Sequence, residues 1–365
     1  MDSAPVVIIG GGTSGSIAAR TLADVTDRPI VVLEPGGFTD DDNPRFLDGL
    51  SDDVLWPDEA MPQARAVGGG SAVNGMILSG DPPDWLEGLV RQAHQHEAGE
   101  LGRGLLDAGG RLSWMWWNNG RWNPGRAMVH VEEEGRLVLD GRAAVSLVLS
   151  GDRAIAVRTT AGEIACSHVV MCAGAILTPR ILVASGIGGA VGEGLQNHPT
   201  VTFTVRRRGD DMGFFDACVV RDLNLDGATG LMIAFERESA VADGRGSVSV
   251  SLMNPVSRGT AGESADFALL SDPLDRSRMG SLVSEAREIV RRMGCDILRE
   301  SGIHPVSHAT SSCARTVDED GELRGFRNIT VADASVLPNV PAETPAASVT
   351  MRSLRISRTL GRRLS

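Results

Sequence analysis

The chain has 365 residues, of which 42% are hydrophobic and 22% charged, and its formal net charge is −12 at pH 7. This length suggests about two domains, and the negative charge argues against nucleic acid or an anionic membrane as the main partner. The chain contains neither tyrosine nor lysine, which excludes P-loop kinases, pyridoxal phosphate enzymes and dehydrogenases that use a Tyr/Lys catalytic pair.

No apolar run reaches the length of a membrane span, and the first predicted strand begins at Val6, which leaves no room for a signal peptide. The five cysteines are scattered without C-x-x-C spacing, so we expect reduced thiols and a cytoplasmic location. We expect no metal site.

The chain opens with a strand, a glycine-rich turn, a helix and a second strand. Four β-branched residues over 6–9 predict a buried strand of a parallel sheet. A helix-compatible run follows over 16–23, and a second apolar strand covers 30–33. This order is typical of the first unit of a doubly wound α/β domain.

The turn places glycines at the G-x-G-x-x-G spacing, which permits a tight turn, close approach of a diphosphate and close helix–strand packing. The diphosphate would lie at the helix N-terminus. An acidic residue after the second strand is placed to bind the ribose hydroxyls of an adenosine. The pattern predicts a dinucleotide, FAD or NAD, bound by Gly10, Gly12, Thr13, Ser14, Gly15 and Glu34.

A second glycine-rich stretch spans 64–76, with three consecutive glycines followed by a serine and an asparagine. Such a backbone can approach a flat ligand closely and donate N–H groups to it. Its apolar flanks favour burial over the alternative of a flexible linker. The candidate ligand-binding residues are Arg65, Gly69, Gly70, Ser71, Asn74, Gly75 and Met76.

This stretch resembles the Gly-Gly-Ser-Ser-x-x-Asn segment of the glucose–methanol–choline (GMC) family of flavin oxidoreductases, which lies against the isoalloxazine ring. The resemblance implies FAD as the cofactor. Where some relatives carry a flavin-linked histidine, this chain has Val73, which implies that FAD is bound non-covalently.

The region 81–122 is less informative. Two histidines, His94 and His96, fall in a helix-like segment, where this spacing would point them apart and disfavour a metal site. Four of the six tryptophans gather at Trp114, Trp116, Trp117 and Trp122. They predict an interdomain core or, alternatively, an aromatic wall of a substrate pocket or a docking surface.

Strands are predicted over 137–139, 144–149 and 154–158, and a further buried strand over 168–175 ends in glycine. The segment 173–188 resembles the second GMC motif, a strand, glycine turn and helix whose dipole would point towards the cofactor. The resemblance implies that Val145, Ala173 and Gly174 contribute to FAD binding.

The next segment, 192–199, resembles the family's Gly-Glu-Asn-Leu-x-Asp-His-Pro, from which it departs at Gly194 and Asn197. We expect its His198 to be structural. Beyond it, strands are predicted over 201–205, 231–235 and 248–252, a solvated strand end over 206–208, and a helix over roughly 275–298.

The last part of the chain carries the family's catalytic motifs. His308 begins a segment that resembles His-x-x-Gly-Thr-Cys, whose histidine is the catalytic base of the family, and His304 is a rival for this role. The family's second pocket residue, an Asn or His, falls on Thr344. His308 and Thr344 are therefore the candidate catalytic residues.

The segment 328–338 matches the family's Asn-Leu-x-Val-x-Asp-Ala-Ser-x-x-Pro motif. Asp333 and Ala334 are expected to hold flavin or ribityl hydroxyls. The final helix is expected to begin with Thr344 as N-cap and Pro345 as its first residue, next to the flavin.

We therefore predict an α/β fold: a Rossmann-like FAD-binding domain (1–80, 123–199 and 301–365) and a discontinuous α+β substrate or cap domain on an antiparallel sheet (81–122 and 200–300). The resemblance implies oxidation of a small-molecule alcohol to a carbonyl, with hydride transfer to flavin N5 and an unknown electron acceptor, either oxygen or a redox partner. Two alternatives stay open: a GMC-fold lyase that keeps FAD structurally, as hydroxynitrile lyases do, and a non-catalytic FAD-binding subunit of a complex.

Overall fold

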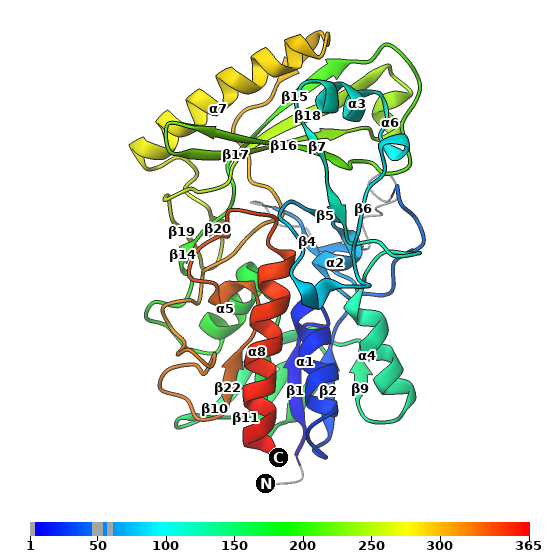
Figure 1. Ribbon diagram of the computed structural model, residues 1–365. Coiled ribbons are helices and arrows are strands. Elements are labelled where there is room, and N and C mark those ends of the chain that lie inside the picture. Colours follow the sequence, from blue (N-terminus) through cyan, green and yellow to red (C-terminus); the bar gives the residue numbers. More distant parts are fainter. Residues whose placement is uncertain (1–3, 46–53, 57–60) are drawn as a thin grey trace.

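A five-stranded parallel sheet forms the lower half of the molecule in Figure 1, in a computed structural model that describes residues 4–45, 54–56 and 61–365. The strand order is β22-β13-β1-β2-β9. The strands are β1 (Val6–Ile9), β2 (Ile30–Leu33), β9 (Val138–Asp140), β13 (His168–Met171) and β22 (Ile329–Val331). Three regions far apart in the sequence therefore build one sheet.

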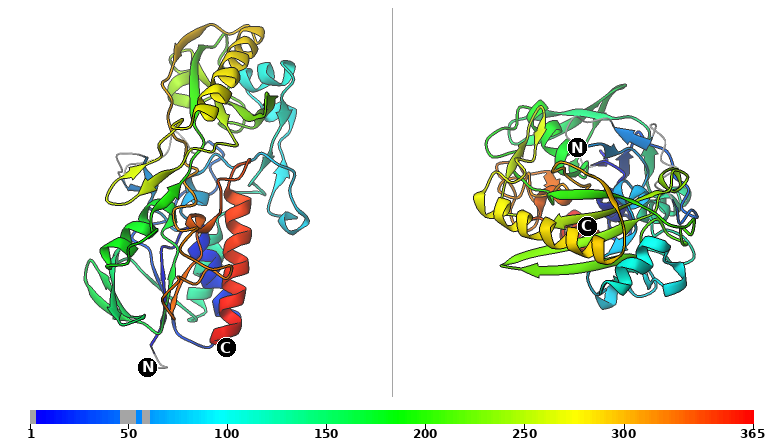
Figure 2. Two further views of the ribbon diagram at one scale, coloured as in Figure 1. Left: turned by 90° about the vertical axis from the view of Figure 1, so that its left-hand side faces the viewer. Right: turned by 90° about the horizontal axis from the view of Figure 1, so that it is seen from above.

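Both faces of this sheet are covered, which explains why its strands are nearly continuous apolar runs. All four residues of β1 are buried, and Val6 pairs with both Ile30 and His168. Figure 2 shows helices on one side, and a small antiparallel sheet together with one helix, α5 (Gly174–Ala184), on the other. The other covering elements are α1 (Thr13–Ala23), α4 (Pro124–Glu133), α8 (Ala346–Leu364), β10 (Ala144–Ser150), β11 (Arg153–Thr159) and β12 (Gly162–Ala165).

A six-stranded antiparallel sheet forms the upper half, in the order β21-β15-β18-β17-β16-β7. Its strands are β7 (Arg111–Leu112), β15 (Thr200–Arg206), β16 (Val219–Leu225), β17 (Ala228–Phe235), β18 (Arg245–Leu252) and β21 (Ile297–Glu300). The helices α3 (Glu100–Asp107) and α7 (Pro273–Arg292) pack against it around a core that includes Phe203 and Leu282. A parallel sheet together with this antiparallel sheet confirms the predicted fold class.

Short elements connect the two halves. One group surrounds the second glycine-rich stretch: β3 (Leu55–Trp56), β4 (Gln63–Ala64), α2 (Gly70–Val73), β5 (Ile77–Leu78), η2 (Asp84–Leu86), β6 (Arg91–Gln92), η3 (Gln95–Glu97) and β8 (Trp114–Met115). The remaining short elements are β14 (Glu193–Leu195), α6 (Glu238–Val241), β19 (Gly259–Ala261), β20 (Ala265–Asp266) and η4 (Ala334–Val336).

Two sequence-based boundaries differ from the structure. The segment 259–266, which we expected in the substrate domain, forms a three-stranded sheet with β14 and packs against Ile176 of α5. The predicted helix over 275–298 ends at Arg292. Gly294 follows with a φ of +73°, a conformation that glycine adopts readily, and the chain then enters β21.

A residue expected at a solvated strand end and an aspartate of the loop after β2 are both buried. Arg207 of the 206–208 run is buried, and its guanidinium lies 3.5 Å from Glu236 and 3.7 Å from Glu100. Asp41 is 8% exposed and pairs with Arg126 at 2.6 Å. Both side chains tie separate segments together through buried charge.

The aromatic region also differs in part from expectation. Trp116 and Trp117 are buried in the core of the upper half, and Trp116 stacks on Trp122 with ring centroids 4.7 Å apart. His94 and His96 do not point apart. Their rings stack at 5.5 Å because His94 precedes the short helix η3 and has extended backbone angles.

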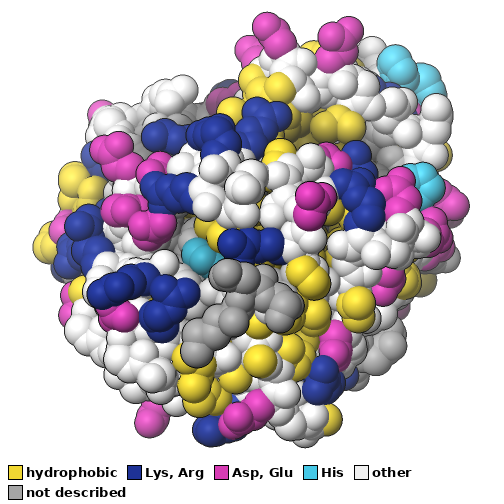
Figure 3. Space-filling view, turned by 90° about the horizontal axis from the view of Figure 1, so that it is seen from below, with side chains coloured by type: hydrophobic (Ala, Val, Ile, Leu, Met, Phe, Trp, Pro, Cys, Tyr) yellow, Lys and Arg dark blue, Asp and Glu magenta, His cyan; other side chains and the backbone are white. Residues whose placement is uncertain are grey.

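The end of the molecule that carries both chain termini is rich in charge. Figure 3 shows arginine and acidic side chains interspersed on this face. Arg363, for example, lies 2.6 Å from Asp320. All five cysteines of the chain have free thiols. Among the described helices, none combines the length and the apolar character needed to cross a bilayer.

Candidate functional site

The first glycine turn lies where two neighbouring parallel strands, β1 and β13, both end. Gly10 has a φ of +98°, and a Cβ on it would lie 2.6 Å from the carbonyl oxygen of Cys172 after β13. A Cβ on Gly15 would lie 1.8 Å from the carbonyl oxygen of Gly10. Only glycine fits either position. The chain connections that follow β1 and β13 leave this edge of the sheet in opposite directions, and open α/β sheets bind ligands at such an edge.

The second glycine-rich stretch packs directly onto this turn. Gly12 forms a bridge with Gly68, and a Cβ on Gly69 would lie 2.7 Å from the Cα of Gly12. Thr13 Oγ1 donates to the carbonyl oxygen of Gly68 and lies 3.1 Å from Ser71 Oγ. The structure therefore brings together the two stretches that the sequence predicts as one ligand site.

Arg121, which is not among the site residues predicted from the sequence, holds the second stretch in place. Its Nη1 donates to the backbone oxygen of Asn74 at 2.7 Å, to the Asn74 side chain at 2.9 Å and to the carbonyl oxygen of Ser71 at 3.2 Å. Burial lowers the pKa of Arg121 to about 10. Arg121 stands among the tryptophans in the sequence, outside every motif, so no pattern indicates this role.

Glu34 directly follows β2 as predicted, and its carboxylate binds the protein backbone. One oxygen accepts the N–H of Gly11 at 3.0 Å and the other accepts the N–H of Gly36 at 2.8 Å. Burial raises the pKa of Glu34 to about 7. Each carboxylate oxygen can accept a second hydrogen bond, so the side chain can hold the turn and still accept a ribose hydroxyl.

The Asp333 carboxylate binds other groups of the protein. One of its oxygens accepts the N–H of Gly174 at 2.8 Å and the hydroxyl of Thr178 at 2.6 Å, and the other accepts the N–H and hydroxyl of Ser335. The side chain is 2% exposed, and burial raises the pKa of Asp333. The Asp333 carboxylate thus binds the N-terminus of α5, and groups of the protein itself donate four hydrogen bonds to its two oxygens.

Two histidines form a pair at the point where the C-terminal motifs meet. His198 Nδ1 lies 2.8 Å from His308 Nδ1, and the rings are nearly perpendicular at 87°. His198 is 0% exposed, while His308 is partly exposed. Burial lowers the pKa of His198 to about 4 and lowers the pKa of His308 well below its ordinary value. Both rings are therefore neutral at pH 7.

The segment that begins with His308 runs beside the 333–335 motif. The N–H of Ser311 donates to the carbonyl oxygen of Ala334, and the N–H of Cys313 donates to that of Ser335. Ser311 stands where the family motif has glycine, and it has a φ of +76°, which explains why glycine suits this position. His304, the rival base, lies at the antiparallel sheet, with Nε2 3.1 Å from Thr202 Oγ1.

Thr344 is not the N-cap of α8, contrary to the sequence-based expectation. The cap position is Pro345, and Thr344 Oγ1 instead donates to the carbonyl oxygen of Ile77 at 2.9 Å and accepts the N–H of Ser79 at 3.2 Å. The Thr344 side chain is 7% exposed. It ties the start of α8 to the end of β5, because the tertiary structure places Ile77 and Ser79 within reach of its hydroxyl.

Comparisons with known proteins agree on one family. The N-terminal model of the GMC oxidoreductases matches residues 118–200, and their C-terminal model matches residues 243–353. The chain belongs to the GMC oxidoreductase family. As a member of that family it is an FAD-dependent oxidoreductase that acts on an alcohol-like substrate.

Solved structures share the fold of this GMC oxidoreductase over nearly its whole length. Pyridoxine 4-oxidase from Mesorbium loti is 21% identical, with a TM-score of 0.82 and 99% of each chain covered. An arginine-to-alanine variant of formate oxidase from Aspergillus oryzae RIB40 is 15% identical, with a TM-score of 0.81 and 99% of each chain covered. An FAD-dependent oxidoreductase from Chaetomium thermophilum is 16% identical, with a TM-score of 0.75 and the same coverage. A search of curated proteins gave no match.

The residues of this GMC oxidoreductase fit FAD. The N-terminus of α1 has no side-chain cap, so its first-turn N–H groups can receive a diphosphate. Ser353 of α8 donates to Ser14 at 2.8 Å, and Thr350 lies three residues earlier on the same face of α8. Thr350 Oγ1 is buried and has no hydrogen-bond partner within the described part of the chain. A buried hydroxyl of this kind calls for a polar partner, which FAD can supply.

The remaining candidate residues of the GMC oxidoreductase occupy different settings. A Cβ on Gly70 or Gly75 would meet nothing within 4 Å, so open space lies beside both. Met76 is buried with a φ of +58°. Val145 lies on β10 with its side chain 46% exposed. The guanidinium of Arg65 lies over the Trp56 ring at 4.8 Å, while Ala173 and Pro345 are the N-cap residues of α5 and α8.

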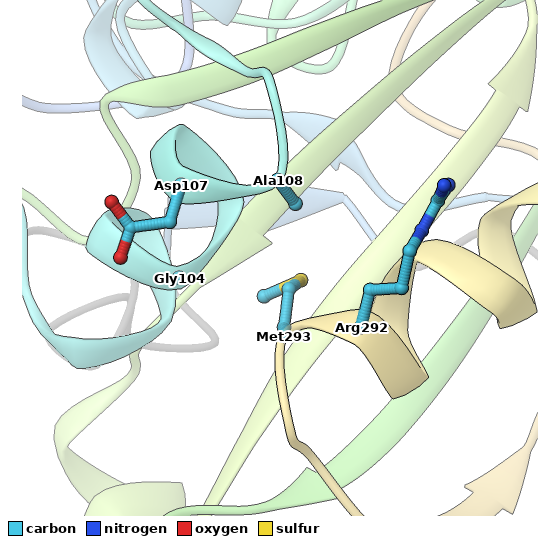
Figure 4. Close-up of a pocket in the computed structure, with 5 residues that line it drawn as sticks. All are labelled: Gly104, Asp107, Ala108, Arg292 and Met293. Atoms are coloured by element: carbon cyan, nitrogen blue, oxygen red, sulfur yellow. The ribbon is translucent and has the colours of Figure 1, made fainter.

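Two cavities lie outside the glycine turns and the histidine pair. The one in Figure 4 has a volume of about 330 Å³ and lies between the ends of α3 and α7, where the charged ends of Asp107 and Arg292 point away from one another. The second, of about 320 Å³, is lined by Ser79, Arg111 and Trp114, among other residues. Neither contains a convergent set of catalytic groups.

Proposed function

We propose that this GMC oxidoreductase oxidises an alcohol to a carbonyl with His308 as the catalytic base. The observation that carries the proposal is the imidazole of His308, which is neutral and partly exposed. His198 holds this imidazole where the segment that begins with His308 runs beside the 333–335 motif. A neutral imidazole has a lone pair that can accept a proton at pH 7.

His308 accepts the hydroxyl proton of the substrate, and the electron pair of that O–H bond becomes the second bond of the carbonyl. FAD, when bound, accepts the hydride that leaves the alcohol carbon, at flavin N5. The protein contributes the orientation of the substrate and a fixed place for the proton. The oxidant that later accepts the electrons, oxygen or a redox partner, is outside the proposal.

The cofactor site of the proposal is built from both glycine-rich stretches. Backbone N–H groups after Gly12 would hold the diphosphate, Glu34 would accept a ribose hydroxyl, and the stretch around Ser71 would contact the flavin. Val73 at the position of the flavin-linked histidine supports non-covalent binding. A cytoplasmic location is part of the same proposal, supported by five free thiols.

Thr344 has no part in proton transfer in this proposal. Its hydroxyl already donates to a backbone carbonyl, and a threonine hydroxyl is no base near neutral pH. Its role is to fix the start of α8. The N-terminus of α8, which has no side-chain cap, is then placed to stabilise negative charge at the flavin.

The deciding experiment is anaerobic stopped-flow reduction of the bound flavin by a panel of primary and secondary alcohols. His308→Ala should reduce roughly 10²- to 10⁴-fold more slowly than the parent while it still binds FAD, since a positioned base contributes that much. His304→Ala is the matched control, because His304 lies at the antiparallel sheet.

Equal rates for His308→Ala and the parent would refute the assignment of the base. If no alcohol reduces the parent protein, the lyase and the non-catalytic FAD-binding subunit become the preferred interpretations. The release of a carbonyl compound and cyanide from a cyanohydrin would then separate these two.

A further inference from the structure

His198 is a buried histidine with both ring nitrogens hydrogen-bonded, and the sequence motif gives it only a structural role. Its side chain is 0% exposed. Nε2 lies 2.9 Å from the carbonyl oxygen of Pro341, and Nδ1 lies 2.8 Å from Nδ1 of His308. Each ring nitrogen thus has an identified partner, and a backbone hydrogen bond with Met253 also raises the pKa of the His198 ring.

These two contacts fix where the protons lie. A carbonyl oxygen can only accept, so His198 must carry its proton on Nε2 and donate it to Pro341. The ring is neutral at pH 7 because burial lowers the pKa of His198 to about 4, and its Nδ1 is therefore a bare acceptor. The hydrogen of the 2.8 Å contact then belongs to Nδ1 of His308.

The consequence concerns the other nitrogen of His308. A neutral imidazole has one N–H, and Nδ1 carries it, so Nε2 of His308 holds the lone pair. When Nε2 takes a proton, the ring becomes a cation that still donates from Nδ1 to His198, and a hydrogen bond from a charged donor is stronger than one from a neutral donor. The proton cannot pass beyond His198, since the next group is a backbone carbonyl.

The backbone around the pair is held on both sides. Asn197 Nδ2 donates to the carbonyl oxygen of Val306 at 2.6 Å, two residues before His308, and Asn197 Oδ1 accepts the N–H of His198. Gln196 Oε1 accepts the N–H of Val340, next to Pro341. Three consecutive side chains, over 196–198, therefore bind the two loops between which the pair lies.

We propose that His198 is a positioning residue that holds His308 in the tautomer with its proton on Nδ1 and its lone pair on Nε2. Its catalytic consequence rests on the proposed function. The tautomer itself does not, and the experiment measures the two separately.

The first measurement is the ¹⁵N spectrum of the imidazoles in the oxidised holoenzyme. His308 should show a protonated Nδ1 and a bare Nε2, and His198 the reverse. In His198→Leu, which has no acceptor, the His308 signals should shift towards the other tautomer. In His198→Asn the side-chain oxygen stands near the former Nδ1 and should keep the parent pattern.

The second measurement is anaerobic flavin reduction by an alcohol. His198→Leu should be roughly 10- to 100-fold slower, the loss expected for one hydrogen bond to a charged group, with unchanged FAD content. His198→Asn should recover most of that rate. His168→Leu is the control, because His168 is also buried and neutral but lies at the start of β13, bonded to Thr330.

A parent spectrum with the proton of His308 on Nε2 would overturn the proposal, as would an unchanged His308 tautomer in His198→Leu. If His198→Leu does not fold, the parent spectrum and His198→Asn still decide. If the tautomers are as expected but no alcohol reduces the flavin, the positioning contact stands and the proposed function fails.

Discussion

The Asp333 carboxylate offers the sharpest test of the structure, because sequence and structure predict different outcomes for Asp333→Asn. The carboxylate accepts four hydrogen bonds of 2.6–2.9 Å, two on each oxygen. Asparagine replaces one acceptor oxygen with an NH₂ group, which faces donors and cannot accept from them.

The magnitude follows from the two bonds that are lost. Hydrogen bonds to a charged group contribute about 1.5–3 kcal/mol each. The hydroxyl of Ser335 or Thr178 can rotate and accept from the new NH₂ group, and the burial that raises the pKa of Asp333 already opposes its charge. We therefore expect Asp333→Asn to lower the free energy of unfolding of the apoprotein by about 2–4 kcal/mol.

The assay is urea denaturation of the flavin-free protein, with FAD affinity measured in parallel. Asp152→Asn is the control, because Asp152 pairs with Arg327 at the surface, where ion pairs contribute little. A loss below about 1 kcal/mol, with FAD affinity greatly reduced, would refute the structural role and restore direct flavin binding by the Asp333 side chain.

Three further outcomes are expected. Thr344→Val should lower the free energy of unfolding by about 1–3 kcal/mol, because Ile77 and Ser79 lose their buried partner, and should leave flavin reduction nearly unchanged; a rate loss as large as that of His308→Ala would contradict this. Glu34 keeps its proton in the folded apoprotein up to a pKa of about 7, against 4.5 for an ordinary glutamate, so its contribution to stability falls as the pH rises from about 4.5 to 7. Relative to Glu34→Gln, the parent should lose up to about 3 kcal/mol over this range, and pH-independent differences in denaturation midpoints would refute the shift. Acid precipitation should release all flavin as unmodified FAD in the mass spectrum, and flavin retained on the precipitate would show a covalent link.

Local patterns were enough to predict the parallel sheet and the glycine turns. The run over 6–9 is apolar on both faces, and Gly10 and Gly15 stand at positions where any Cβ would collide with a carbonyl oxygen. Such constraints act within one strand–turn–helix unit, so spacing along the chain is sufficient to detect them. The His308 motif was found in the same way, and Ser311 takes up the backbone angle of the glycine that it replaces.

Interactions between distant segments could not be predicted in this way. Thr344 is a residue type preferred at an N-cap, and it precedes a proline, which is preferred at the first helical position. Its hydroxyl nevertheless binds Ile77, which lies 267 residues away along the chain. Arg207 looks like a solvated strand end, but the fold surrounds it with Glu236 and Glu100. A short polar side chain bonds whatever the tertiary structure places beside it, and the sequence does not contain that neighbour.

The sequence by itself determined the fold class, the dinucleotide turn and the family, because each depends on residue types at fixed spacing. Only the tertiary structure decided how the polar groups are used: Asp333 at the N-terminus of α5, Arg121 under the second glycine stretch, and His198 against His308. The reason is physical. Hydrogen bonds depend on distances of about 3 Å between atoms, and for residues far apart in the chain only the packed fold sets those distances.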